Sequence, residues 1–133
     1  LGAVANQTAR VEGITKTVGV PILVTDEVAK RLCENRILSR RVARFRPAGM
    51  EQVVDLFTIE ATPPDAAARQ ATMERLNTHT KGLEAFEAGE WEKAWKLLHP
   101  IVEGDAAARY VYKLALQGKP PRDWDGVVEL TAK

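Results

Sequence analysis

A pair of prolines near the middle of the chain separates two segments that cannot form one continuous helix or strand. At residues 60–65 the sequence reads Glu-Ala-Thr-Pro-Pro-Asp, and the apolar run 53–59 gives way there to alanine-rich sequence. Proline lacks a backbone N–H and disfavours helical conformation at the residue before it. We therefore expect a mixed α and β segment before the break and a helical segment after it.

Short apolar runs rich in β-branched residues mark the first segment. The runs are bounded by Gly, Pro, Asp or Asn and cover residues 21–25, 41–46 and 53–59. This pattern is typical of strands. Residues 6–16 show helical spacing of apolar side chains, and Thr25 opens a second helix that extends to about Glu34. These elements predict an α+β fold with helices on a mostly antiparallel sheet.

The second segment carries start and stop signals for helices. Thr62 as N-cap, with Pro63 at the first helical position and an acid at the third, predicts a helix start. The helix that contains Leu83 and Phe86 should stop near Gly89. Trp91, Trp95 and Leu98 follow at i, i+4 and i+7 on the next helix. We expect a small all-α hairpin.

The end of the chain predicts one more helix and a closing segment. Asp105 is the expected N-cap of a helix that ends at Gly118, before Pro120-Pro121. The segment after it holds a turn and a short apolar run at Val127-Val128. Trp124 should dock back onto the helices. These signals predict three parts: residues 1–60, a linker and connecting helix at 61–76, and a helical tail at 77–133.

Composition and charge exclude several classes of function. Hydrophobic residues make up 45% and charged residues 28% of the 133-residue chain, which is ordinary for a soluble globular protein. Nineteen Lys and Arg oppose eighteen Asp and Glu, so no global field attracts nucleic acid or anionic lipid. No apolar run approaches the ~20 residues of a membrane helix. We expect a cytoplasmic chain without contact to membrane or nucleic acid.

Cysteine and histidine usage gives no metal or nucleophile signal. Cys33 is the single cysteine, so an internal disulfide is impossible, and it lies near a predicted helix C-terminus that disfavours a thiolate. His79 and His99 stand twenty positions apart without ligand spacing. We expect no metal bound by this chain alone. The sequence begins at Leu1, at the start of the motif described next, and we expect it to be a piece of a longer protein.

The first thirteen residues carry the clearest chemical pattern. They read Leu-Gly-Ala-Val-Ala-Asn-Gln-Thr-Ala-Arg-Val-Glu-Gly. On a helix Asn6 and Arg10 share a face, one turn apart. A guanidinium offers a planar fork to phosphate oxygens, and an amide can orient a hydroxyl beside it. The same spacing also fits a solvated helix face on which Arg10 meets any nearby carboxylate.

This stretch resembles a segment of the class III nucleotide cyclases. Gly2, Asn6, Ala9, Arg10, Glu12 and Gly13 match it without a gap, and the similarity to bacterial members continues through residues 14–29 and Phe57. The resemblance covers residues 1–60. It implies the C-terminal part of a bacterial adenylate or guanylate cyclase catalytic domain, with ATP or GTP as substrate and a cyclic nucleotide and pyrophosphate as products.

The resemblance also implies roles for individual residues. Asn6 and Arg10 would be catalytic, the first orienting the ribose and the second neutralising charge that develops on the phosphates. Such enzymes place the active site between two subunits and use Mg²⁺ or Mn²⁺, which aspartates upstream of Leu1 would bind. We therefore expect a homodimer, and an inactive isolated chain. Related sequences often carry a phosphate-facing Lys where this chain has Ala48.

A run of arginines offers substitutes for that lysine. Arg36, Arg40, Arg41, Arg44 and Arg46 follow one another with no acid from Asn35 to Gly49. Arg44 and Arg46 are candidates to bind substrate phosphate. The alternative is a solvent-facing strand whose charges prevent edge pairing. An RNA-binding role is ranked last, because Phe45 is the one aromatic residue in the run.

The helical segment resembles one tetratricopeptide repeat. The matching residues are Gly82, Phe86, Gly89, Trp91, Ala94 and Leu98. A stable solenoid needs ~3 such repeats, so a hairpin packed against its own chain is the simpler interpretation. The competing hypothesis for the whole chain is a non-catalytic interaction module, in which a degenerate cyclase remnant carries a helical tail that binds a partner.

Overall fold

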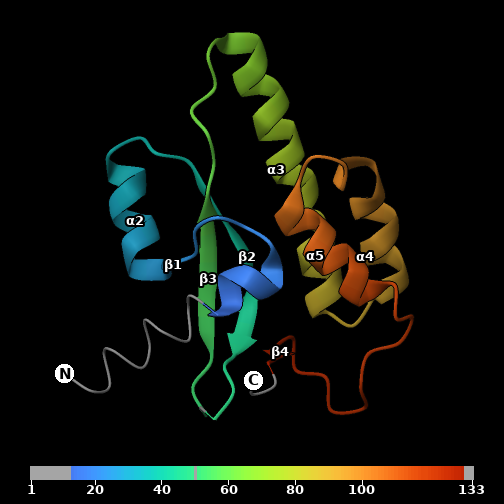
Figure 1. The fold of residues 1–133 in the computed structure, drawn as a ribbon. Helices are drawn as coiled ribbons and strands as arrows, with labels where there is room; N and C mark the ends of the chain where they lie inside the picture. The colour runs from blue at the N-terminus through green and yellow to red at the C-terminus, as the bar shows by residue number, and fades with distance from the viewer. Residues whose placement is uncertain (1–12, 50, 131–133) are drawn as a thin grey trace, which may run out of the picture.

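The computed structural model describes residues 13–49 and 51–130, which form a sheet flanked by helices (Figure 1). Within these residues the sheet has the strand order β1-β3-β2-β4. The strands are β1 (Val24–Thr25), β2 (Ser39–Arg46), β3 (Val54–Ile59) and β4 (Val128–Glu129). β3 pairs antiparallel with β1 and β2, whereas β4 runs parallel to β2. The predicted α+β class with a mostly antiparallel sheet is confirmed.

The helices lie on two sides of this sheet. They are α2 (Asp26–Glu34), α3 (Ala66–Glu87), α4 (Trp91–Leu98), the 3₁₀ turn η1 (His99–Ile101) and α5 (Ala106–Ala115), and residues 13–18 are also helical. α2 contacts β1 and β3, while α3 and α5 contact β2. Figure 1 shows α2 on one side of the sheet and α3 to α5 grouped on the other. None of the helices in the described ranges combines the length and apolar character needed to cross a bilayer.

The start of α3 differs from the predicted one. Asp65, not Thr62, is the N-cap, and its carboxylate accepts a hydrogen bond from the Ala68 N–H at 2.8 Å. The reason is the proline pair: Pro63, the predicted first helical residue, precedes Pro64, which disfavours helical conformation at that position. The helix starts instead at Ala66. From there α3 continues for 22 residues across the predicted boundary between linker and tail.

α3 and α4 pack very closely as an antiparallel hairpin. Gly82 of α3 faces Leu98 of α4, and a Cβ built on Gly82 would lie 2.5 Å from the Leu98 side chain. The turn between the helices passes through Gly89, whose φ of 85° favours glycine. The hairpin that the spacing predicted is present, and Gly82 permits its close helix contact.

The closing segment adds a strand to the sheet, so the tail is not all-α as predicted. Val128 of β4 pairs with Phe45 of β2, and the Leu130 N–H donates to the Arg46 carbonyl at 3.1 Å. The apolar pair Val127-Val128 is buried there. β-branched residues suit a pleated, half-buried surface better than a helix. This strand covers part of the β2 edge that would otherwise be open.

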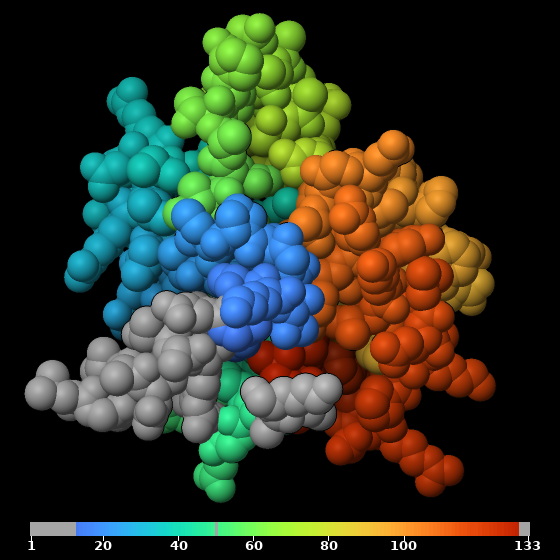
Figure 2. Space-filling model, in the orientation of Figure 1, coloured from blue at the N-terminus to red at the C-terminus, as the bar shows by residue number. Residues whose placement is uncertain are grey.

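The hydrophobic core is continuous from the N-terminal helix to the tail. The buried cluster draws on the 13–18 helix, the sheet and the tail; its members include Ile14, Val18, Phe45, Leu56, Phe86, Leu98, Val111 and Val128. Figure 2 shows the described N-terminal residues (blue) lying directly against the helical tail (orange). α5 ends at Ala115, three residues before the predicted Gly118.

Candidate functional site

The predicted catalytic pair lies outside the described residues. Asn6 and Arg10 precede residue 13, where the description begins. The helix that follows them, at residues 13–18, buries Ile14 and Val18 against the core, with 5% exposure each. The roles of Asn6 and Arg10 therefore stay predictions.

The two candidate phosphate ligands are both paired with carboxylates. Arg44 Nε donates to Asp55 of β3 at 2.9 Å. Arg46 donates to Asp125 at 3.1 Å and also pairs with Glu129 of β4. A phosphate would have to displace these carboxylates, because each already occupies the guanidinium that would receive it.

Arg40 lies inside the protein rather than on a solvent-facing strand. It is 9% exposed and forms a two-pronged ion pair with Asp105, with an Nη1–Oδ2 distance of 2.8 Å. Arg75 of α3 donates to the same carboxylate at 2.6 Å, and Glu60 pairs with both arginines. Two guanidiniums and two carboxylates thus form a charge-balanced cluster, called here the Arg40 cluster. The surface interpretation of the arginine run is wrong at this position.

Asp105 is the centre of the Arg40 cluster. Its carboxylate also caps α5 by accepting from the Ala108 N–H at 3.0 Å. Burial on its own would raise the pKa of Asp105, but the hydrogen bonds from Arg40 and the Ala108 N–H outweigh it and lower the pKa to about 2. The group therefore stays ionised throughout the physiological range. The sequence identified Asp105 as a cap but gave no signal of its ion pair, because Arg40 is far away in the chain.

Arg41 and His79 form a second contact between the sheet and α3. Arg41 Nη2 lies 2.6 Å from Glu87 Oε1, and Nη1 lies 3.5 Å from Asp55. The ring of His79 is 1% exposed, with Nε2 at 2.9 Å from the Arg41 carbonyl. A carbonyl only accepts, so Nε2 carries the hydrogen and the neutral ring has a bare Nδ1. Burial, assisted by the charge of Arg40, lowers the pKa of His79 to about 4.

A hollow of about 400 Å³ opens beside the Arg40 cluster. Its walls come from the chain before β1, the end of β3, the start of α3 and the start of α5; the charged side chains on them are Arg40, Glu60, Arg75 and Asp105. These charges are already paired with one another, as described above. The hollow therefore has no excess charge with which to select an anion or a cation.

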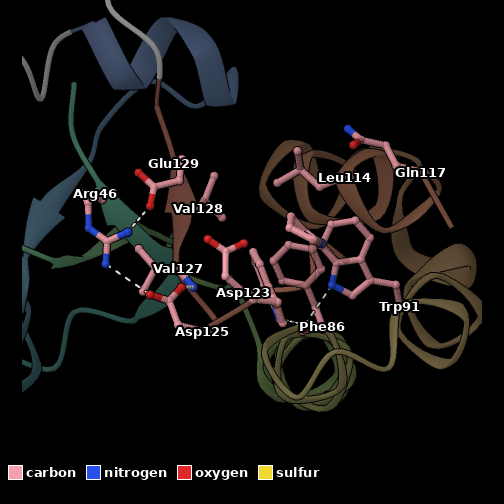
Figure 3. Close-up of a pocket in the computed structure, with 12 residues that line it drawn as sticks. Arg46, Phe86, Trp91, Leu114, Gln117, Asp123, Asp125, Val127, Val128 and Glu129 are labelled. Atoms are coloured by element: carbon pink, nitrogen blue, oxygen red, sulfur yellow. Dashed lines mark hydrogen bonds and ion pairs between the residues drawn. The ribbon is translucent and has the colours of Figure 1, made fainter. Parts of the chain in front are cut away.

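A second cavity of about 300 Å³ lies between the closing segment and the helices (Figure 3). One wall is aromatic, with Phe86, Trp91 and Trp124, and the opposite wall carries Asp123, Asp125, Glu129 and Arg46. It is here called the aromatic cavity. The sequence predicted that Trp124 docks on the helices, which is confirmed by its ring contacts with Phe86 and Trp91. The acids were not recognised as cavity residues.

In the described ranges no group of three or more His, Cys, Asp or Glu side chains is placed to hold a metal ion. Cys33 is exposed near the C-terminal end of α2. His99 lies at the surface in η1, with its ring 5.9 Å from that of Tyr112.

Comparison with known proteins gives no assignment. No protein family, curated protein or solved structure matches the chain in the three searches. The interpretation of function therefore depends on the residues themselves.

Proposed function

We propose that the chain is the C-terminal portion of a bacterial class III nucleotide cyclase, which converts ATP or GTP to the 3′,5′-cyclic nucleotide and pyrophosphate. The observation that carries the proposal is the unbroken motif of residues 2–13, which contains Asn6 and Arg10 at one-turn spacing. The described fold agrees with it at the coarse level, since helices flank a mostly antiparallel sheet.

In this proposal the chain contributes positioning and charge stabilisation. The 3′-hydroxyl of the nucleotide attacks the α-phosphorus, and pyrophosphate leaves. Asn6 orients the ribose, and Arg10 stabilises the negative charge on the phosphate oxygens in the transition state. The active site forms between two protomers. Mg²⁺ or Mn²⁺ would be bound by carboxylates outside this chain, so the isolated chain is expected to be inactive.

Arg10 is the preferred phosphate ligand over Arg44 and Arg46. Both of the latter already pair with carboxylates, whereas the cyclase motif itself supplies Arg10. If Arg44 binds phosphate, Asp55 must first release this arginine. If Arg46 binds phosphate, Asp125 and Glu129 must first release it.

The second candidate function is a non-catalytic interaction module. Two observations favour it: the phosphate-facing loop has Ala48 in place of lysine, and the nearby arginines join the sheet to its own acids. The sequence upstream of Leu1 discriminates between the two candidates. Two suitably placed aspartates there would support the enzyme, and their absence would support the module.

The decisive experiment measures cyclic nucleotide formation by the longer parent protein. Asn6→Ala and Arg10→Ala should each lower turnover by at least about 100-fold, the scale of losing one preorganised charge-stabilising group. Arg69→Ala is the matched control, because Arg69 is exposed on α3 and its side chain makes no hydrogen bond or ion pair to the described part of the chain. Unchanged turnover in both site variants, with an active parent, would refute the assigned roles.

A further inference from the structure

The aromatic cavity is formed where three separate parts of the chain meet. Phe86 comes from α3, Trp91 from α4 and Trp124 from the closing segment. Their rings are in mutual contact: Phe86 stacks on Trp91 at 5.1 Å between centroids, and Trp124 meets Trp91 edge to face at 5.2 Å. The wall is therefore a fixed aromatic group rather than a set of loose surface side chains.

The polar atoms of both indoles are already used by the protein. Trp91 Nε1 and Trp124 Nε1 each donate to the Phe86 carbonyl at 3.1 Å. Phe86 and Trp91 are almost fully buried, so the surface that this wall offers a ligand is mainly the carbon and π surface of the half-buried Trp124. The face of such a ring attracts cations, because the ring quadrupole is negative at the face.

The opposite wall has an excess of negative charge. Three carboxylates, from Asp123, Asp125 and Glu129, stand against one guanidinium, that of Arg46. Arg46 pairs with Asp125 and Glu129. Asp123 makes no side-chain hydrogen bond or ion pair to any other described residue, and Figure 3 shows its carboxylate directed into the cavity between the strand and the aromatic wall. One carboxylate is thus left for a ligand.

We propose that the aromatic cavity binds an organic cation, a primary ammonium or guanidinium group, which pairs with Asp123 and lies against the aromatic wall. A volume of about 300 Å³ fits a small amine or the end of a lysine or arginine side chain. The hollow beside the Arg40 cluster lacks this selectivity because its charges are balanced. The proposal is independent of cyclase activity and goes beyond it.

Tryptophan signals make the cavity directly observable. The chain has three tryptophans, of which Trp91 and Trp124 line the cavity and Trp95 lies outside it, near Lys96. In a ¹H–¹⁵N spectrum of the 133-residue chain, butylammonium chloride should shift the Trp91 and Trp124 indole signals and leave that of Trp95 unchanged. n-Butanol, which has the same chain without the charge, should bind at least about tenfold more weakly.

Asp123→Asn tests the pairing group. We expect it to weaken butylammonium binding at least about fivefold, since it removes one charge-assisted hydrogen bond. The fold should survive, because the Asp123 side chain is exposed and makes no hydrogen bond or ion pair within residues 13–49 and 51–130. Glu103→Gln is the matched control: it removes one carboxylate from an exposed loop away from the cavity and should leave binding unchanged.

A second ligand distinguishes a cation that belongs to a partner protein from a cation that is a free amine. A capped Gly-Lys-Gly peptide that binds more tightly than butylammonium would assign the cavity to a side chain of a partner protein. Tighter binding of butylammonium would assign it to a free amine. Equal binding of butanol and butylammonium, equal shifts of all three tryptophans, or unchanged binding by Asp123→Asn would each overturn the proposal.

Discussion

Arg40 near the start of β2 and Asp105 at the start of α5 form a buried ion pair across 65 positions of the sequence. The pair connects the β-rich segment to the helical tail at a point where both side chains are almost fully buried. Arg75 and Glu60 complete it, so that every charge has an opposite neighbour. A partly formed cluster would be unfavourable, because a buried charge without its partner loses its solvation and gains no ion pair in return.

Asp105→Asn should destabilise the protein strongly. Asparagine can still cap α5, so the change removes the charge while it keeps the cap. We expect a loss of about 3 kcal/mol in the free energy of unfolding, measured by urea denaturation, since Arg40 then keeps only the longer contact to Glu60. Asp65→Asn is the matched control, because Asp65 caps α3 with the same geometry but is exposed. Similar losses in both variants would show that the loss comes from removing a negative charge at a helix N-terminus, and not from breaking the buried ion pair.

His79 should make stability depend on pH between about 6.5 and 4. The pKa of His79 is lowered from 6.5 to about 4, so the unfolded chain binds the proton more readily than the folded one. The stabilisation is complete above pH 6.5 and decreases as pH falls towards 4, by about 3 kcal/mol in total. Asp105 adds a second loss at lower pH, as its lowered pKa predicts, from its ordinary 3.8 towards about 2.

His79→Gln checks this assignment. Glutamine keeps a donor for the Arg41 carbonyl but cannot take up a proton. Urea midpoints measured from pH 7 to 4 should become nearly flat for this variant over the upper part of that range. His99→Gln should retain the wild-type slope because His99 lies at the surface. A slope that persists without His79 would place the titrating group elsewhere.

Local patterns predicted most of the elements but not how the two segments join. Helix α2, strands β2 and β3, and the α3–α4 hairpin follow from apolar periodicity and caps, which act over a few residues. The pairing of Val128 with Phe45 does not. A strand of two residues has too little pattern to be recognised, and its partner lies on the far side of the helical tail in the sequence.

The arginine run shows the same limit for the candidate site. No acid lies within it, from Asn35 to Gly49, so a solvent-facing strand and an anion site were both open interpretations. The fold supplies acids from five other places: Asp55 on β3, Glu60 just after β3, Glu87 on α3, Asp105 before α5, and the pair Asp125 and Glu129 in the closing segment. Charge complementarity over such distances depends on topology, which periodicity does not contain.

Gly82→Ala tests the close packing of the hairpin. The added Cβ would overlap Leu98, which is fully buried, so we expect a loss of about 1–3 kcal/mol. Gly13→Ala is the control, because no atom of the described residues lies within 4 Å of its added Cβ; alanine in that helix should be neutral or stabilising by up to about 1 kcal/mol. In the double variant Gly82→Ala with Leu98→Ala, the loss should be smaller than the sum of the single losses. If the losses in the free energy of unfolding were strictly additive, the added methyl group and the Leu98 side chain would not be in steric conflict.

Trp124→Ala should release the closing segment while the helices stay folded. Trp124 Nε1 donates to the Phe86 and Glu87 carbonyls at 3.1 Å, and its ring packs on Phe86 and Trp91. With these contacts removed, β4 is held against β2 by its short ladder, by the burial of Val127 and Val128, and by the ion pairs of Arg46 at the surface. Hydrogen exchange of the Leu130 N–H, which donates to the Arg46 carbonyl, should accelerate at least about tenfold, whereas amides within α4 should keep their protection.

Trp95→Ala removes a tryptophan that is outside the aromatic cavity and should leave the Leu130 amide protected. If Leu130 exchanges at the same rate in Trp124→Ala and the wild type, the strand pairing and not the indole anchors the end of the chain.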